Sequence, residues 1–444
     1  MSIVSYLIEP GGALTGEIRI PGDKSISHRA AMLGAIANGK TRISNFLEGE
    51  DALATLNVFR DLGVNIEGPS HGEVVIAGAG MRGLTAPKRS LDCGNSGTSM
   101  RLLCGILAAQ NFDSVLTGDE SLRRRPMSRV AGPLNQMGAR IDTAAGGLPP
   151  LRVSGGSKLS GITFEMPVAS AQVKSALLLA GLYATGQTKI IEPVATRDHT
   201  ERMLSTFGCA VSREALRLRS GQADQMVIEG GSELKASEIH VPGDLSSAAF
   251  FMVGASIAPG SDVTLKEAGV NPTRAGVIEI LRLMGANIQL SNQKMLGSEP
   301  VADIRVRTAK LKGIEIPQRL VANAIDEFPI LFVAAANATG ETRFSGAYEL
   351  RVKESDRIVT MAEGLSTLGV RADPTEDGIR IIGGDYRGGE IDSRGDHRVA
   401  MAFAMAGLRA KERIVVRDCA NVATSFPGFV DTARNAGLKI MIGD

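Results

Sequence analysis

The segment 21–29, PGDKSISHR, brings a lysine, a serine and an arginine together at one predicted helix start. Its Pro-Gly pair breaks the chain, Asp23 or Ser25 can cap, and the small apolar residues that follow favour a helix. A helix start attracts anions because it carries about half a positive charge and unpaired N–H groups. Ser25 and Arg29 share one face, so the guanidinium can reach the space beside the Lys24 ammonium. The pattern predicts a small-anion site; the alternative is a capped helix with solvated charges.

Further cations lie at other helix starts of the first half. A cation follows four residues after a small residue in three pairs, Ser25/Arg29, Gly97/Arg101 and Ser170/Lys174. The loop 116–129 adds Arg123, Arg124, Arg125 and Arg129, which a solvated surface loop would largely explain. We expect Arg125, next to Pro126, to point inward. The motif TRDHTE places Arg197 and His199 at another helix start.

The second half adds acids that could move protons. NAIDEFP puts Asp326 and Glu327 at a helix start, where carboxylates could equally serve as caps. ELRVKESDR places Lys353, Glu354 and Arg357 on one helical face, and an exposed ion-pair ladder worth roughly a few tenths of a kcal/mol is the alternative. A last helix start, RGDHR, carries Arg394, Asp396, His397 and Arg398. Together these residues suit a small phosphate- and carboxylate-bearing substrate held by arginines, with acids for proton transfer.

The elements that position these residues form an internal repeat. The tripeptide PGD recurs 221 residues on, at 242–244, and Ser246 then matches Ser25. Six amphipathic helices end in glycines spaced by about 75 residues, at Gly63, Gly138, Gly208, Gly285, Gly369 and Gly437. Short alternating strands follow most of them. We therefore predict six βαβα-type units in two sets of three, which fits two similar α/β domains.

The repeat also predicts where one domain gives way to the other. GEIRI, before the first PGD, reads as a strand left over from the last unit, and we infer that it pairs with the second half. The first domain is then 21–240, and the second is 1–20 plus 241–444. The chain would cross near 20–21 and 240–241, and two crossings make a hinge that could close on a ligand. A rigid tandem array is the alternative.

Composition excludes several function classes. The 444 residues include 49 basic and 48 acidic side chains, so no global field draws nucleic acid or a membrane surface. Four scattered cysteines lack zinc spacing and predict buried thiols in a cytoplasmic protein, and we identify neither a signal peptide nor a membrane span. The GxGxxG at 78–83 precedes no predicted helix, which argues against a dinucleotide site. No P-loop, HExxH or acidic metal cluster is evident.

Eight segments, in order along essentially the whole chain, resemble the 5-enolpyruvylshikimate-3-phosphate synthase family. They are PGDKSISHR, GNSGTSMR, RRRPM, ASAQVKSALL, TRDHTE, DEFP, LRVKESDR and GDHRVAMAFA. The resemblance implies two domains, each of three βαβαββ units in an inside-out α/β barrel, with the active site in the interdomain cleft. It implies transfer of the enolpyruvyl group of phosphoenolpyruvate to the 5-hydroxyl of shikimate 3-phosphate, with release of phosphate. Neither a metal nor a cofactor is implied, and we expect a monomer.

The resemblance also implies residue roles. Shikimate 3-phosphate would contact Lys24, Ser25, Arg29, Ser170, Ala171, Gln172, Arg197, Asp326 and Lys353. Phosphoenolpyruvate would contact Lys24, Gly97, Arg125, Gln172, Arg357 and Arg398. Asp326 would take the 5-hydroxyl proton, Glu354 would handle the methylene proton, and Lys24 would assist.

Two departures limit what the resemblance carries over. Thr424 stands where the better-known branch has a lysine, so that phosphate contact is absent or replaced. ASAQVK and TRDHTE resemble the divergent bacterial branch, where glyphosate tolerance goes with an alanine at the position of Gly97. We therefore expect glyphosate to bind. The alternatives are the sister enolpyruvyl transferase acting on UDP-N-acetylglucosamine, which usually has a reactive cysteine in the Arg-rich loop, and a non-catalytic anion-binding repeat scaffold.

Overall fold

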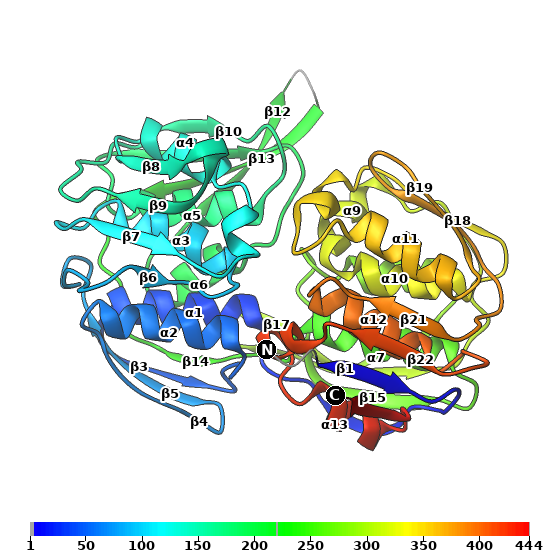
Figure 1. Cartoon of the computed structure of the whole chain (residues 1–444). Coiled ribbons are helices and arrows are strands. Elements are labelled where there is room, and N and C mark those ends of the chain that lie inside the picture. Colours follow the sequence, from blue (N-terminus) through cyan, green and yellow to red (C-terminus); the bar gives the residue numbers. More distant parts are fainter. Residues whose placement is uncertain (1–3, 219–220, 444) are drawn as a thin grey trace. The chain divides into compact units, whose positions relative to one another are not determined.

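A computed structural model of the chain describes residues 4–218 and 221–443, which divide into two compact units (Figure 1). The first unit comprises Gly22–Val241 and Gly297–Glu299. The second comprises Met1–Pro21, Pro242–Leu296 and Pro300–Asp444. The sequence assigned 297–299 to the second unit, but they group with the first because Ser298 and Glu299 bind side chains of helix α6 (His199–Thr206). Hinge motion stays a prediction.

Each sheet of the first unit has four strands. In the order across the sheet that is given below, the first strand pairs in parallel with the second. The first sheet orders β14 (Glu238–His240), β3 (Asn38–Ser44), β5 (Glu73–Ala79) and β4 (Asn65–Ser70). The second orders β6 (Leu91–Asp92), β7 (Ser114–Thr117), β9 (Leu148–Val153) and β8 (Ile141–Ala144). The third orders β10 (Thr163–Glu165), β11 (Gln187–Glu192), β13 (Gly221–Glu229) and β12 (Ser212–Leu218).

The second unit has three more sheets, and two of them again have four strands with the first two parallel, whereas the remaining one has three antiparallel strands. One orders β2 (Thr15–Arg19), β15 (Asp262–Gly269), β17 (Glu299–Arg307) and β16 (Asn287–Leu296). Another orders β18 (Glu341–Phe344), β20 (Ile379–Ile382) and β19 (Arg371–Pro374), and the last orders β21 (Gly389–Asp392), β22 (Ile414–Arg417), β1 (Ser5–Ile8) and β23 (Ile440–Gly443). The GEIRI segment forms strand β2, which pairs in parallel with β15, so its predicted pairing with the second half is confirmed. Its assignment to the last unit is wrong, because β1 and not β2 joins the last sheet.

Helices pack against these sheets in the order of the repeat. The first unit has α1 (Lys24–Ile36), α2 (Glu50–Asp61), α3 (Gly97–Leu107), α4 (Ser128–Gln136), α5 (Ala171–Gly181) and α6. The second has α7 (Leu245–Ile257), α8 (Gly276–Leu283), α9 (Gln318–Ala324), α10 (Phe328–Ala336), α11 (Arg357–Thr367), α12 (His397–Ala406) and α13 (Phe429–Ala436). Short 3-10 turns are η1 (Leu122–Arg124), η2 (Ala145–Gly147), η3 (Ile325–Glu327), η4 (Tyr348–Val352) and η5 (Ala420–Thr424).

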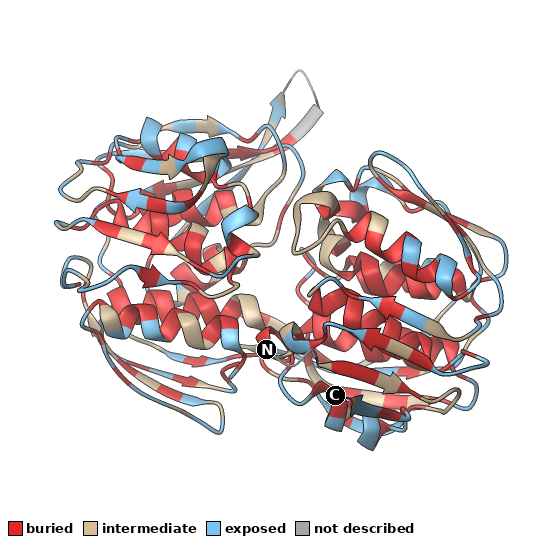
Figure 2. Cartoon of the chain, viewed as in Figure 1, coloured by how far each residue is buried: buried red, intermediate tan, exposed pale blue. Residues whose placement is uncertain are grey.

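The core of each unit is a group of three apolar helices. In the second unit α7, α10 and α12 pack together, and all thirteen residues of α7 are buried (Figure 2). In the first unit α3 contacts both α1 and α5. None of the helices within the described residues is long and apolar enough to cross a membrane. Because all of these helices except α10 begin at a residue whose side chain caps them, the polar side chains at those helix starts are held by the core.

The six predicted helix ends are confirmed. Each closing glycine has a positive φ, between 85° and 116°, which side-chain-bearing residues rarely adopt. The turn at each glycine ends the amphipathic helix and directs the chain into the next strand. At the GxGxxG sequence, strand β5 leads into turns without a helix, so the argument against a dinucleotide site holds.

Candidate active site

Arg29, a predicted anion ligand of the first unit, is buried, with 4% of its surface exposed. Its Nε donates to Thr200 Oγ1 (2.7 Å), Nη2 to Ser175 Oγ (2.7 Å) and Nη1 to the Ser25 carbonyl (3.0 Å). All three acceptors are neutral. Burial therefore lowers the pKa of Arg29 from 12.5 to about 10, although Glu201 and Asp23 partly oppose the shift. A buried cation that contacts only neutral acceptors is stabilised when an anion binds beside it.

Lys24 and Arg29 take different partners. Asp23 caps α1 by accepting from the Ile26 amide (2.9 Å), so this helix start is already partly neutralised. Lys24 Nζ pairs with Asp51 Oδ2 of α2 at 3.0 Å, whereas Arg29 turns to α5 and α6. The Asp23 carboxylate already accepts from the Ile26 amide at the start of α1. An anion that binds here must therefore be attracted mainly by the side chains of Lys24 and Arg29.

The next repeat joins a glycine, two arginines and a glutamine. Arg101 Nη1 donates to Gln172 Oε1 (2.8 Å), and Gln172 Nε2 donates to Thr98 Oγ1 (3.0 Å). Arg125 is buried, as predicted, and donates to Asn95 Oδ1 (2.6 Å). A Cβ on Gly97 would lie 2.6 Å from Arg101 Nη1 and 3.5 Å from Arg125 Nη1. A methyl group here would therefore push against the Arg101 guanidinium, whereas its contact with Arg125 would be an ordinary one.

Lys174 differs from the other cations of its series. Its ammonium is fully buried and lies 2.8 Å from Glu201 Oε1 and 3.2 Å from Glu192 Oε1. Burial raises the pKa of Glu192, and Lys174 and Thr196 oppose that shift. Grouping Lys174 with anion-binding helix starts was therefore wrong, because two carboxylates already compensate its charge. It fixes the loop that precedes α6 and carries Arg197.

Ser170 and its neighbours begin α5. The Ser170 hydroxyl caps the helix by accepting from the Val173 amide (3.4 Å), and Ala171 is the first helical residue. At α6, His199 Nδ1 lies 2.7 Å from Glu299 Oε1, a partner one hundred residues away. No sequence signal paired these two residues, because the contact depends on how the β16–β17 hairpin folds back.

Three predicted residues of the second unit meet around one carboxylate. Asp326 Oδ1 lies 3.3 Å from Lys353 Nζ and 3.7 Å from Arg357 Nη1. Asp326 belongs to η3, and α10 has no side-chain cap, so capping does not explain this acid. Within residues 4–218 and 221–443, the buried Nη1 of Arg357 has no hydrogen-bond partner. A buried guanidinium nitrogen of this kind points to a ligand oxygen.

Arg357 is held by two further carboxylates. Nη2 donates to Glu354 Oε2 (2.7 Å) and Nε donates to Asp396 Oδ2 (2.8 Å). Burial would lower the pKa of Arg357, but Asp396 and Glu354 outweigh it and raise that pKa. Asp396 also caps α12 by accepting from the Arg398 amide (2.9 Å). One carboxylate thus sets the positions of two predicted phosphoenolpyruvate ligands.

The helical face predicted for residues 353–357 is wrong, and so is the alternative of an exposed ion-pair ladder. Residues 353–356 are not helical, and α11 begins only at Arg357, where Asp356 caps it through the Val359 amide (3.1 Å). Arg357 is buried rather than exposed. The irregular backbone lets Lys353 and Glu354 reach Asp326 and Arg357, respectively.

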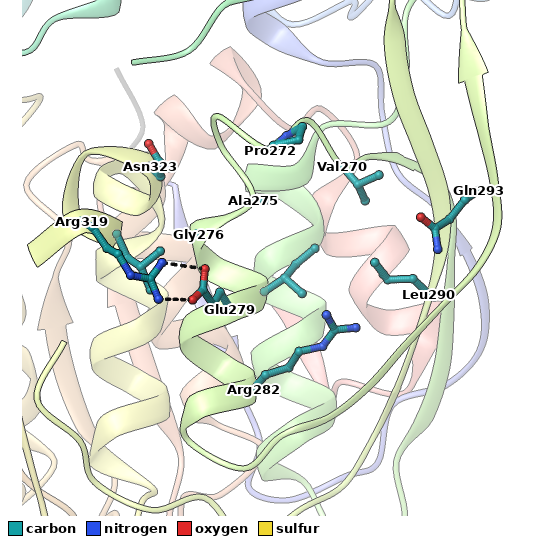
Figure 3. A pocket seen from close by; sticks show the side chains of 12 residues that line it. Val270, Pro272, Ala275, Gly276, Glu279, Arg282, Leu290, Gln293, Arg319 and Asn323 are labelled. Carbon is teal, nitrogen blue, oxygen red and sulfur yellow. Dashed lines mark hydrogen bonds and ion pairs between the residues drawn. The ribbon is translucent and has the colours of Figure 1, made fainter. Parts of the chain in front are cut away.

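Thr424 does not present a free donor in place of the missing lysine. It is buried in η5, and its hydroxyl donates to the Asn421 carbonyl (2.7 Å). Elsewhere in the second unit, α8, α9 and β16 line a groove of about 640 Å³ (Figure 3). Its Glu279 already pairs with Arg319, and no predicted substrate contact lines it. We do not assign this groove to the site.

Comparison of the sequence with known proteins identifies the family of this chain. The family described as EPSP synthase (3-phosphoshikimate 1-carboxyvinyltransferase) matches residues 8–433. The chain belongs to the EPSP synthase family. It is 62% identical over 442 residues to the 3-phosphoshikimate 1-carboxyvinyltransferase of Alkalilimnicola ehrlichii, with coverage of 99% of this chain and 97% of that protein. The Methylococcus capsulatus protein of the same name is 60% identical, with 99% of each covered.

Solved EPSP synthases share the fold. The structure of the Acinetobacter baumannii EPSP synthase superimposes with a TM-score of 0.87 at 54% identity and covers 99% of this chain and 100% of that one. The predicted family and the predicted fold class, with three repeat units in each of two domains, are confirmed. The EPSP synthase residues named from the motifs form two groups, one in each unit, and their roles are taken up below.

Proposed function

We infer that this chain is a 3-phosphoshikimate 1-carboxyvinyltransferase, which transfers the enolpyruvyl group of phosphoenolpyruvate to the 5-hydroxyl of shikimate 3-phosphate and releases phosphate. The observation that carries this inference is the full-length identity to relatives of that name. Their name favours shikimate 3-phosphate over UDP-N-acetylglucosamine as acceptor. The reaction belongs to the shikimate pathway of aromatic amino acid biosynthesis.

We propose that the first unit binds most of shikimate 3-phosphate. Arg29, held by neutral oxygens, would gain a phosphate or hydroxyl partner, with Lys24, Ser25, Ser170, Ala171, Gln172 and Arg197 contributing contacts. Gly97 and Arg125 would hold phosphoenolpyruvate together with Arg357 and Arg398 of the second unit. Arginine suits this task because its planar fork binds carboxylate and phosphate bidentately.

We propose that the carboxylates of the second unit move the protons. Asp326, 3.3 Å from Lys353, would remove the 5-hydroxyl proton as that oxygen bonds to C2 of phosphoenolpyruvate. Glu354 would protonate the methylene carbon, which gives a tetrahedral intermediate. Loss of a proton from the resulting methyl group, as the C2–O bond to phosphate breaks, then restores the double bond. Lys24 would assist from the first unit.

Phosphate release with each acceptor tests this function. Phosphoenolpyruvate with shikimate 3-phosphate should release phosphate, whereas UDP-N-acetylglucosamine should not support turnover. Asp326→Ala and Glu354→Gln should each lower kcat by about 100-fold or more while substrate binding persists. Asp373→Asn is the matched control, because this half-exposed carboxylate of β19 pairs with Arg371 and Arg380 and is none of the predicted site residues. Near-normal turnover of either acid variant would remove its assigned role.

We propose a cytoplasmic monomer. Its four free, buried cysteines fit a reducing compartment. The balanced charge favours small-molecule substrates over nucleic acid or membrane partners.

A further inference from the structure

The second PGD segment keeps a serine but loses the cations that surround its counterpart. Leu245 and Phe250 stand where the first repeat has Lys24 and Arg29, and both are buried. The helix start of α7 therefore has no basic side chain of its own for an anion. Ser246 nevertheless stays polar and 3% exposed, so its hydroxyl must serve another purpose.

That hydroxyl belongs to a buried polar chain. Ser246 Oγ donates to Glu327 Oε1 and accepts from Arg274 Nη2 (2.7 Å). Arg274 Nη2 also lies 2.9 Å from Asp244 Oδ1, the cap of α7. On its other side Glu327 Oε1 lies 3.9 Å from Arg398 Nη1. A serine thus connects a structural ion pair to an arginine of the candidate site.

Arg398 contacts η3 at two consecutive residues. Its Nη1 donates to the Asp326 carbonyl (3.1 Å) while facing the Glu327 carboxylate. The Glu327 side chain is fully buried, and that of Arg398 is 9% exposed. A fixed buried charge next to Arg398 restricts where its guanidinium can lie. It holds the guanidinium across the η3 backbone, beside the acid that we assign as base.

We propose that Glu327 is a positioning residue for phosphoenolpyruvate binding, acting through Arg398 and itself held by Ser246. This proposal rests on the proposed function, in which Arg398 binds phosphoenolpyruvate. The second PGD segment then serves the same site as the first: Ser25 would contact the substrate, whereas Ser246 holds Glu327, which positions the substrate ligand Arg398.

The test separates positioning from folding. Glu327→Gln keeps an oxygen that can accept from Ser246 but removes the charge facing Arg398. We expect the KM for phosphoenolpyruvate to rise about tenfold, while the KM for shikimate 3-phosphate changes less than twofold. The matched control is Asp303→Asn in β17, another buried carboxylate of the second unit, paired with Lys266 (2.5 Å). That variant should lose thermal stability without changing either KM.

A double-variant cycle tests the link through Ser246. Ser246→Ala should raise the KM for phosphoenolpyruvate about threefold, and adding it to Glu327→Gln should cause little further change, because both act on one chain of contacts. An unchanged KM in Glu327→Gln, or the same KM change in Asp303→Asn, would overturn the proposal. Fully additive effects would refute the part played by Ser246. If the unmodified enzyme releases no phosphate with shikimate 3-phosphate, both the function and this proposal fall.

Discussion

Arg29 and Lys174 are buried cations at the α5–α6 interface with opposite electrostatic surroundings. Arg29 donates to neutral oxygens, whereas Lys174 pairs with Glu192 and Glu201. Replacing each with methionine removes the charge and keeps an apolar stem of similar length. We predict that Arg29→Met keeps or raises the unfolding temperature, and that Lys174→Met lowers it strongly.

The magnitudes follow from the two sets of partners. Lowering the pKa of Arg29 from 12.5 to about 10 means that its site disfavours the cation by about 3 kcal/mol relative to water. Its loss leaves the hydroxyls satisfied, because Thr200 donates to Ser175 (2.7 Å), which donates to the Ala171 carbonyl (2.6 Å). Lys174→Met instead leaves two carboxylates without their buried cation, which typically destabilises by about 3–5 kcal/mol.

Scanning calorimetry at pH 7 and titration with shikimate 3-phosphate measure both effects. Arg29→Met should unfold within about 5 °C of the unmodified enzyme or above it, and should lose detectable binding. Lys174→Met should unfold about 10 °C lower and still bind the ligand below that temperature. If Arg29→Met destabilises as much as Lys174→Met, the guanidinium is a structural cross-link and our anion-site reasoning fails.

Two further predictions concern the pocket and the cysteines. Gly97→Ala should raise the KM for phosphoenolpyruvate about tenfold, and the inhibition constant of glyphosate more, because the methyl group would displace Arg101 from Gln172. Steady-state kinetics with both compounds would show this, and unchanged constants would exclude the crowding. Burial raises the pKa of Cys104 to about 12 and that of Cys419 to about 12, so both stay protonated thiols at pH 8. Mass spectrometry after iodoacetamide treatment of the folded enzyme should find neither alkylated, whereas rapid inactivation by alkylation would favour a reactive-cysteine transferase.

The sequence predicted features that depend on local chemistry. The six helix-ending glycines, a capped helix start at 23–25 and the inward turn of Arg125 each follow from neighbours within a few residues, although the choice of Asp23 over Ser25 as the cap does not. The repeat could be found because each unit must bury the same apolar helix against the same kind of sheet. The resemblance then named the candidate ligands.

What the sequence could not predict is which cation pairs with which acid. Lys174 resembled Arg29 by spacing, yet its partners lie 18 and 27 residues further along the chain. Arg357 was placed on a helical face with Lys353, but the helix begins at Arg357 and the guanidinium reaches Asp396, 39 residues away. Periodicity gives the face of a helix, whereas these pairings depend on how separate repeats pack.

The contrast between Arg29 and Arg357 predicts how substrate binding is linked to proton uptake. Arg29 is held by neutral oxygens before an anion binds, whereas Arg357 already donates to Glu354 from its Nη2 at 2.7 Å and has only Nη1 left for a ligand oxygen. A phosphoenolpyruvate oxygen at Nη1 would bring a second negative charge close to Glu354, and a carboxylate beside another anion takes up a proton more readily.

We therefore expect phosphoenolpyruvate binding, in the presence of unreactive shikimate 3-phosphate lacking its 5-hydroxyl, to be accompanied by net proton uptake. Calorimetry in buffers of different ionisation enthalpy measures this quantity. Glu354→Gln should abolish the uptake, and Asp373→Asn should leave it unchanged. Equal uptake in Glu354→Gln would mean that another group gains the proton, and that Arg357 does not couple binding to the acid.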